Sequence, residues 1–170
     1  GSLQARVDGL ALKTALGELA GIDAIDGSLS GTLSLQGRGE SWNALMASLT
    51  GRGSASIARG SIRGIDLSVL TASNAAIPTL MGRLFNGSTA FTAARADLSI
   101  AGPTIYAPEL TVTGSGFSAE MAAEASLGSP DIRAHGAIEL AGRRAPPATQ
   151  PFEITGSWSH PVVRATGQTP

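Results

Sequence analysis

The side chains able to carry metal or acid–base chemistry are few in this sequence. Its histidines are His135 and His160, and it contains no cysteine. A structural zinc site generally needs about four such ligands converging at fixed spacing, and the sequence offers no such set. We therefore expect no metal and no cofactor, and we expect His135 to be a solvated side chain on the polar side of a strand.

Two carboxylates are spaced as a pair. Glu120 and Glu124 fall on the same side of an alternating run, two steps apart. Acid–base catalysis would require a cleft that gives the two carboxyl groups different environments, whereas their surroundings in the sequence predict a solvated strand face. Serines are plentiful, but no Gly-x-Ser-x-Gly elbow frames one as a nucleophile. The chain is therefore expected to be non-enzymatic.

Two glycine-rich runs could in principle bind phosphate. The run at residues 37–39 precedes a helix-like segment, but Trp42 stands where a dinucleotide fingerprint needs its third glycine. The run at residues 51–53 is not followed by the Gly-Lys-Ser/Thr of a P-loop. Both runs are predicted to be turns.

Charge and composition exclude further classes of function. Lys plus Arg number 12 and Asp plus Glu number 13, which leaves a formal charge of −1, and no basic cluster is larger than Arg143-Arg144. A nucleic-acid partner is not expected, because little would neutralise a phosphate backbone. Charged residues make up 15% of the chain, against about 25% in typical domains. The surface should therefore be less polar than usual.

The chain is interpreted as one domain with short ends. Gly1-Ser2 looks like the scar of a cleaved tag, and residues 166–170 like a tail. Residues 3–165 have the length of a single ordinary domain. The sequence has no uninterrupted apolar stretch near the roughly 20 residues of a membrane span, so membrane attachment would need regions absent from this fragment.

Period-two alternation is the dominant pattern and predicts strands with one apolar side. It runs through residues 3–8, 28–36, 90–100, 106–112, 117–125, 131–140 and 152–158. Turn sequences join the later runs at residues 102–103, 114–116 and 128–130. Strands joined so tightly must be antiparallel neighbours, because a parallel crossover needs about a dozen residues or more. Residues 141–151 are predicted to form a longer loop before the last strand.

Three segments break this period and predict short amphipathic helices. Residues 12–21 place leucines at helical spacing and stop at a glycine. Residues 42–51 follow a Ser41 N-cap and also stop at a glycine. Residues 66–84 form the third helical segment, with an interruption predicted at Pro78.

The expected fold class is mainly β (α+β). We expect a curved, twisted antiparallel β-sheet of about seven to nine strands with two to four short helices packed on it. If consecutive strands pair, their apolar sides fall on one side of the sheet. That face would be either a core or a lipid-facing surface, and it carries Leu29, Leu33, Leu35, Leu98, Ile100, Leu110, Val112, Phe117, Met121, Ile132, Ile138, Leu140 and Ile154.

Three segments together resemble the C-terminal region of AsmA-like proteins. The first is GTLSLQGRGESWNALMASLTG at residues 31–51, and the second is GSIRGIDL at residues 60–67. In that family a strand, a serine-led helix and a further strand lead into Gly-Ile/Val-Asp-Leu and another helix. The closing run ITGSWSHP, at residues 154–161, is similar to the family's Ile-x-Gly-Thr-x-x-x-Pro ending.

The resemblance implies a function as well as a fold. AsmA-like proteins, related to the TamB-like bridge proteins, are tethered to the inner membrane of the Gram-negative periplasm. They are associated with outer-membrane assembly and with moving phospholipid along an apolar β-sheet groove. The implied partners of this chain are phospholipid or another lipid, the membrane through regions absent here, and envelope proteins.

Other classes of function remain open from the residues alone. A scaffold domain could dock a protein partner at an exposed sheet edge. A carbohydrate-binding sandwich would need aromatic platforms, whereas aromatic residues are only 4% of the chain. The same apolar face could also be an ordinary core packed beneath the helices.

Overall fold

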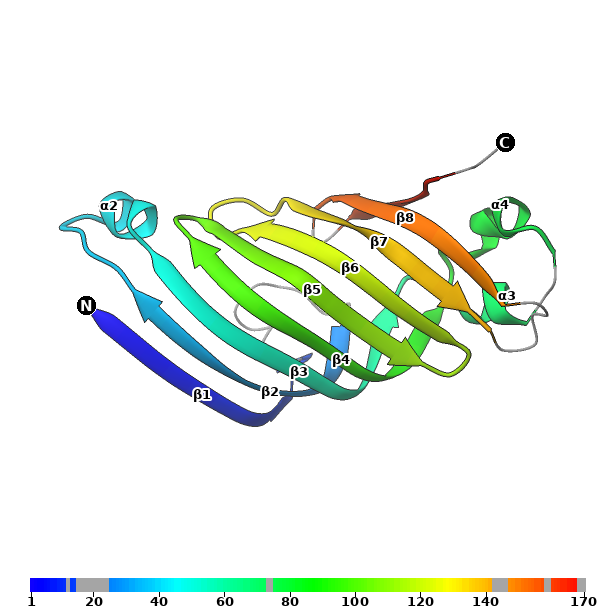
Figure 1. Cartoon of the computed structure of the whole chain (residues 1–170), viewed down its shortest axis with the longest axis horizontal. Coiled ribbons are helices and arrows are strands. Elements are labelled where there is room, and N and C mark those ends of the chain that lie inside the picture. The colour runs from blue at the N-terminus through cyan, green and yellow to red at the C-terminus, as the bar shows by residue number, and fades with distance from the viewer. Residues whose placement is uncertain (12, 15–24, 73–74, 142–146, 158–159, 168–170) are drawn as a thin grey trace.

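The structure is a computed structural model that describes residues 1–11, 13–14, 25–72, 75–141, 147–157 and 160–167. It consists of strands with short helical segments between some of them (Figure 1). The strands are β1 (Ser2–Ala11), β2 (Ile25–Gln36), β3 (Thr50–Arg63), β4 (Ser88–Ala101), β5 (Thr104–Gly114), β6 (Phe117–Ser126), β7 (Ile132–Leu140), β8 (Ala148–Gly156) and β9 (Pro161–Ala165). The helical segments are α2 (Trp42–Ala47), α3 (Ser68–Thr71), α4 (Ile77–Leu80) and the 3₁₀ turn η1 (Met81–Arg83).

The nine strands form one open sheet in the order of the chain, from β1 to β9. Every neighbouring pair is antiparallel, and the sheet is visibly twisted and curved (Figure 1). The mainly β prediction and the consecutive antiparallel pairing are confirmed. The α+β description overstates the helical part, because the described helices contain only 6, 4 and 4 residues.

The predicted turns join the strands as expected. β4 and β5 meet at residues 102–103, β5 and β6 at 115–116, and β6 and β7 at 127–131. Gly102 and Gly116 have φ angles of 59° and 79°, in the left-handed region that costs glycine little. These two glycines therefore allow tight reversals between strands whose pairing begins immediately beside the turn.

Two bulges shift the alternation and correct the predicted strand faces. The β2–β3 register shifts between Asp26 and Ser28, opposite Arg59 of β3, which has a positive φ of 51°. Beyond this point Phe91 of β4 is buried while Ala90 is exposed. Ala90 was expected to share a side with Ala94, and this was wrong. The β5 register shifts between Ala107 and Leu110, so an extra residue separates the two halves of the strand.

The β5 bulge also moves Tyr106 away from its predicted side. Tyr106 was expected to share a face with Leu110 and Val112, but it pairs with Ser99 and Glu124. It is 41% exposed. Pro108 lies within the bulge, where its missing N–H costs the sheet little.

The helix predictions hold in part. Ser41 caps α2, because its Oγ accepts a hydrogen bond from the Ala44 amide at 3.2 Å, but the helix ends at Ala47 rather than near Gly51. The third segment is broken between α3 and α4, and Pro78 lies inside the first turn of α4, where proline is tolerated. The helix predicted for residues 12–21 lies largely outside the described residues.

The C-terminal part contains more strand than predicted. Residues 148–151 belong to β8, which begins at Ala148, whereas they were assigned to a loop. β9 was not predicted as a separate strand, and its pairing with β8 runs from Phe152–Ala165 to Gly156–Pro161. No helix in the described ranges has the length and apolar character needed to cross a membrane.

The core lies on one side of the sheet at the end where α3 and α4 sit, opposite α2 (Figure 1). It joins buried residues of the helical segments, such as Leu70 and Leu84, to buried strand residues such as Phe91 and Leu140. Leu140 has an exposed fraction of 0%. Burying a leucine of this kind contributes about 1.5–3 kcal/mol to stability.

Candidate functional site

The strand pairing places the thirteen apolar residues singled out in the sequence on one face of the sheet, here called the inner face. Leu35 of β2 lies opposite Gly51, which lies opposite Ile100 of β4, and the row continues to Ile132 of β7. A parallel row joins Leu110, Met121 and Phe152 through Gly136. The residues meet because direct cross-strand partners point to the same side of a sheet.

Burial divides these thirteen residues into two groups. The members that are buried are Ile100, Val112, Phe117, Ile138 and Leu140. The members that are half-buried are Leu29, Leu33, Leu35, Leu98, Leu110, Met121, Ile132 and Ile154. The inner face is therefore sealed core over one part and a partly exposed apolar surface over the rest.

A helical cover closes part of the inner face. It comprises residues 64–72 and 75–87 between β3 and β4, and its Leu70, Ile77 and Leu84 are buried in the core cluster. At its base the Gly64 amide donates to the Gly87 carbonyl at 2.8 Å. The cover is thus tied at its base by backbone hydrogen bonds and held over the sheet by apolar packing.

Thr89 fixes the base of the cover to β4. Its hydroxyl donates to the Ile65 carbonyl at 2.6 Å and accepts from the Leu67 amide at 2.9 Å. Thr89 is a polar residue among the buried residues, and 8% of its surface is exposed. Because both of these hydrogen bonds are made within the fold, burial of the hydroxyl carries little penalty.

A cavity of about 130 Å³ lies between the cover and the inner face. Its walls come from the cover and from β3 to β9, and they include Leu70, Val112, Met121 and Phe152. No charged side chain lines it among the described residues. A cavity with such walls favours apolar guests.

Gln150 is a polar residue in the otherwise mainly apolar lining of this cavity. It stands on the inner face opposite Ile138. Its amide nitrogen donates to the carbonyl oxygens of Pro151 at 2.7 Å and of Thr166 at 3.0 Å. The amide group therefore links β8 to the chain after β9, with its N–H groups directed to the backbone.

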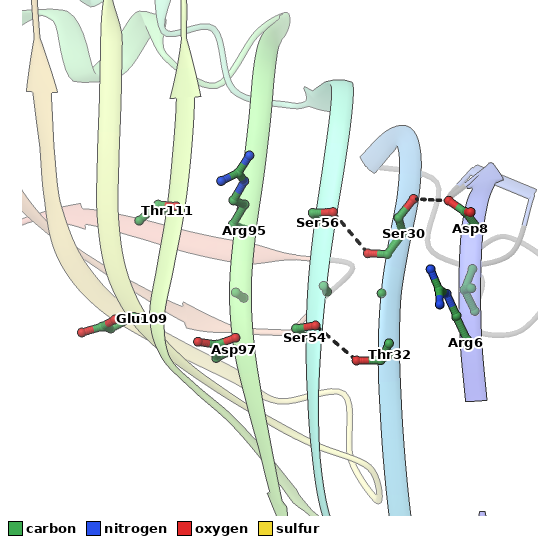
Figure 2. A pocket seen from close by; sticks show the side chains of 14 residues that line it. Arg6, Asp8, Ser30, Thr32, Ser54, Ser56, Arg95, Asp97, Glu109 and Thr111 are labelled. Atoms are coloured by element: carbon green, nitrogen blue, oxygen red, sulfur yellow. Dashed lines mark hydrogen bonds between the residues drawn. The ribbon is translucent and has the colours of Figure 1, made fainter. Parts of the chain in front are cut away.

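The opposite, outer face is polar and contains a broad concavity of about 480 Å³ across β1 to β5. Figure 2 shows a floor of serine and threonine side chains from the central strands, with Arg6 and Arg95 on either side. The hydroxyls of Thr32 and Ser54 lie 3.3 Å apart, and the Ser30 hydroxyl donates to Asp8 Oδ1 at 3.3 Å. This surface offers hydrogen bonds to a polar molecule.

The outer concavity places Ser30 beside the carboxylate of Asp8. No histidine lines the concavity in the part of the chain that the structure describes. A serine nucleophile needs an adjacent base to remove its proton. The described residues of the concavity can therefore hydrogen-bond a polar molecule, and they offer Ser30 the Asp8 carboxylate but no imidazole as a base.

The acid–base candidates from the sequence are exposed. Glu120, Glu124, His135 and His160 all lie at the surface. Glu120 and His135 border a second depression of about 440 Å³ on the outer face. No cluster of three or more potential metal ligands occurs among the described residues.

Sequence reasoning missed several cavity residues. Gln150 carried no signal, because residues 141–151 were assigned to a loop, and Val163 and Ala165 belong to the unpredicted strand β9. The leucines of the cover were recognised as one side of a helix, and that spacing was the available signal.

No family model, curated protein or solved structure matches this chain.

Proposed function

We propose that this chain is a non-enzymatic lipid-handling domain of an AsmA-like envelope protein. In this proposal the domain lies in the periplasm, is tethered to the inner membrane by other parts of the protein, and takes part in outer-membrane assembly and phospholipid transport. The single observation that carries it is the continuity of the inner face, where an apolar cavity adjoins half-buried apolar residues on the same sheet.

The energetics favour capture of acyl chains. Each CH₂ group removed from water contributes about 0.8 kcal/mol, so an acyl chain lying on an apolar strand face gains several kcal/mol even when one side stays wet. The half-buried residues Leu29, Leu33 and Leu98 provide such contacts without a charged clamp. Weak, repeated contacts of similar strength suit a ligand that must slide and leave.

Adjacent residues of β4 provide a matched test of this proposal. Leu98 is half-buried on the inner face, whereas the next residue, Ser99, is exposed on the outer face. Leu98→Glu should weaken binding of a fluorescent fatty acid, because a charge would enter the apolar contact surface. Ser99→Glu adds the same charge to the other face and should bind like the parent protein.

Two results would oppose lipid handling. The first is an organic extract of the purified protein that contains no phospholipid by mass spectrometry, together with no saturable binding of fatty acid or phospholipid by the parent chain. The second is equal binding by Leu98→Glu and Ser99→Glu, both folded by circular dichroism. Equal binding would place the lipid away from the inner face.

A second candidate function is a scaffold that docks a protein partner along the edge of the sheet. β1 pairs with β2 alone among the described strands, and nine of its ten residues are exposed. An open strand edge carries unpaired backbone groups that can accept a further strand. N–H groups alternate between the two sides of a strand, so one of the neighbouring residues Gln4 and Ala5 directs its N–H away from β2. Replacing that residue, as Gln4→Pro or Ala5→Pro, should abolish such docking, because proline has no N–H to donate.

A further inference from the structure

The cavity beneath the helical cover is too small for a whole lipid. Its volume is about 130 Å³, slightly below the roughly 150 Å³ of an apolar cavity that admits one benzene molecule, so about five or six carbon atoms fit. Two acyl chains side by side, or a polar headgroup with its hydration, would not fit. The volume matches the end of one alkyl chain.

The lining of the cavity also excludes a headgroup. No charged side chain contributes among the described residues. The Thr89 hydroxyl already makes two hydrogen bonds, and the Gln150 amide nitrogen is directed to two backbone carbonyls. A charged or hydroxylated group entering the cavity would lose its hydration without finding equivalent partners.

A row of half-buried residues leads from the cavity across the inner face. Met121 lines the cavity and lies opposite Leu110, and this row continues through Ala96 and Ala55 to Gly31 on β2. On β2 to β4 the residues of this row are smaller than those of the neighbouring rows, which carry Leu33, Leu98, Leu29 and Ile57. From β2 to β6 the row crosses four strand spacings, about 19 Å.

The length of this row suits one chain of a membrane lipid. A bilayer core is about 30 Å thick, so one leaflet and one of its acyl chains extend about 15 Å. Such a chain spans about three strand spacings, so with its last carbons beside Met121 it reaches along the row to Ala55 on β3. The headgroup would then lie on the β2–β3 side of the sheet.

From these observations we infer that the cavity is an acyl-end pocket. It receives the methyl end of a single alkyl chain, whose remainder lies along the row from Met121 to Ala55. This inference rests on the proposed lipid-handling function and adds the orientation of the ligand.

Tryptophan reporters test the orientation. In a background where Trp42 and Trp158 are replaced by phenylalanine, Phe152→Trp places a reporter in the cavity wall and Leu33→Trp places one near the other end of the inner face. The probes are stearic acids with a nitroxide near the methyl end or near the carboxyl end. The methyl-end probe should quench Phe152→Trp more strongly, and the carboxyl-end probe should quench Leu33→Trp more strongly.

A cavity-filling pair tests the pocket itself. Ala119 is buried and lines the cavity, and Ala119→Leu should fill part of it. Each methylene thereby excluded should lower the affinity for a long saturated fatty acid about fourfold. Ala125→Leu adds the same side chain to the same strand and inner face, outside the cavity lining, and should bind as the parent does.

The outcomes separate the two proposals. No binding of either probe to the parent chain refutes lipid handling as well as the pocket. Binding with the same quenching order at both reporters, or with equal affinity in Ala119→Leu and the parent, refutes the acyl-end pocket and leaves lipid handling standing. If Ala119→Leu does not fold, the two tryptophan reporters decide the question.

Discussion

Leu140→Ala should be among the most destabilising single truncations in this domain. Leu140 is completely buried and lies opposite Phe117 on β6 and Ala148 on β8. Removing three carbons loses about 2.4 kcal/mol of transfer free energy at about 0.8 kcal/mol per methylene. The cavity left behind adds to this, and buried Leu→Ala changes generally cost about 3–5 kcal/mol. We expect that loss in the free energy of unfolding, measured by urea titration followed by circular dichroism.

Leu127→Ala is the matched control for this measurement. Leu127 is 46% exposed, in the turn between β6 and β7. The same truncation there should change the free energy of unfolding by no more than about 0.5 kcal/mol. If Leu140→Ala also changed it by less than about 1 kcal/mol, the assignment of this face as sealed core beneath the cover would be refuted.

Three further measurements address other parts of the molecule. Met121→Glu puts a charge into the wall of the apolar cavity, so urea titration should show that the free energy of unfolding falls by about 2 kcal/mol or more. A variant as stable as the parent that also binds fatty acid equally well would contradict the position assigned to Met121. Ser41→Ala removes the N-cap of α2 and should lower the free energy of unfolding by about 1 kcal/mol while lipid binding stays unchanged. An unchanged urea midpoint would show that the cap adds no stability. Elemental analysis of the purified protein should find no stoichiometric metal, and a stoichiometric metal would overturn the expectation drawn from the sequence.

The sheet was predictable because its signals are local. Alternation along residues 117–125 and 131–140 sets which side of each strand is apolar, and the intervening Gly-Ser-Pro turn makes the two strands neighbours. The same reasoning yields the antiparallel order from β4 to β7, whereas no alternating run predicted β3 and β9 was not predicted at all. The shared face of Leu98, Leu110 and Met121 follows directly from that order.

The errors arose where the backbone departs from regular geometry. A left-handed Arg59 is not signalled by its residue type, and the shift it produces moved Ala90 out of the predicted face. The β5 bulge did the same to Tyr106, although Pro108 was a visible warning. A phase shift of one residue moves every later side chain to the other face, so an alternation rule cannot survive an unrecognised bulge.

The cavity could not be predicted, since it depends on how the cover meets the sheet. The spacing of Leu67, Leu70 and Leu84 indicated an apolar side for this segment but not the strands beneath it. Its volume is the gap left between Met121 and Phe152 below and the leucines above. A gap of this kind is decided by side-chain packing in three dimensions, which sequence periodicity does not encode.

The consecutive order of the strands has a consequence for how the molecule folds and opens. Each strand that the structure describes pairs only with its neighbours in the chain. Contacts are therefore local for a β protein, and folding should be faster than in sandwiches with distant pairings. The buried core cluster contains no residue of β1 or β2 among the described residues. These two strands can therefore open without disturbing the packing under the cover, and their amide hydrogens should exchange with solvent well before those of β5 to β7.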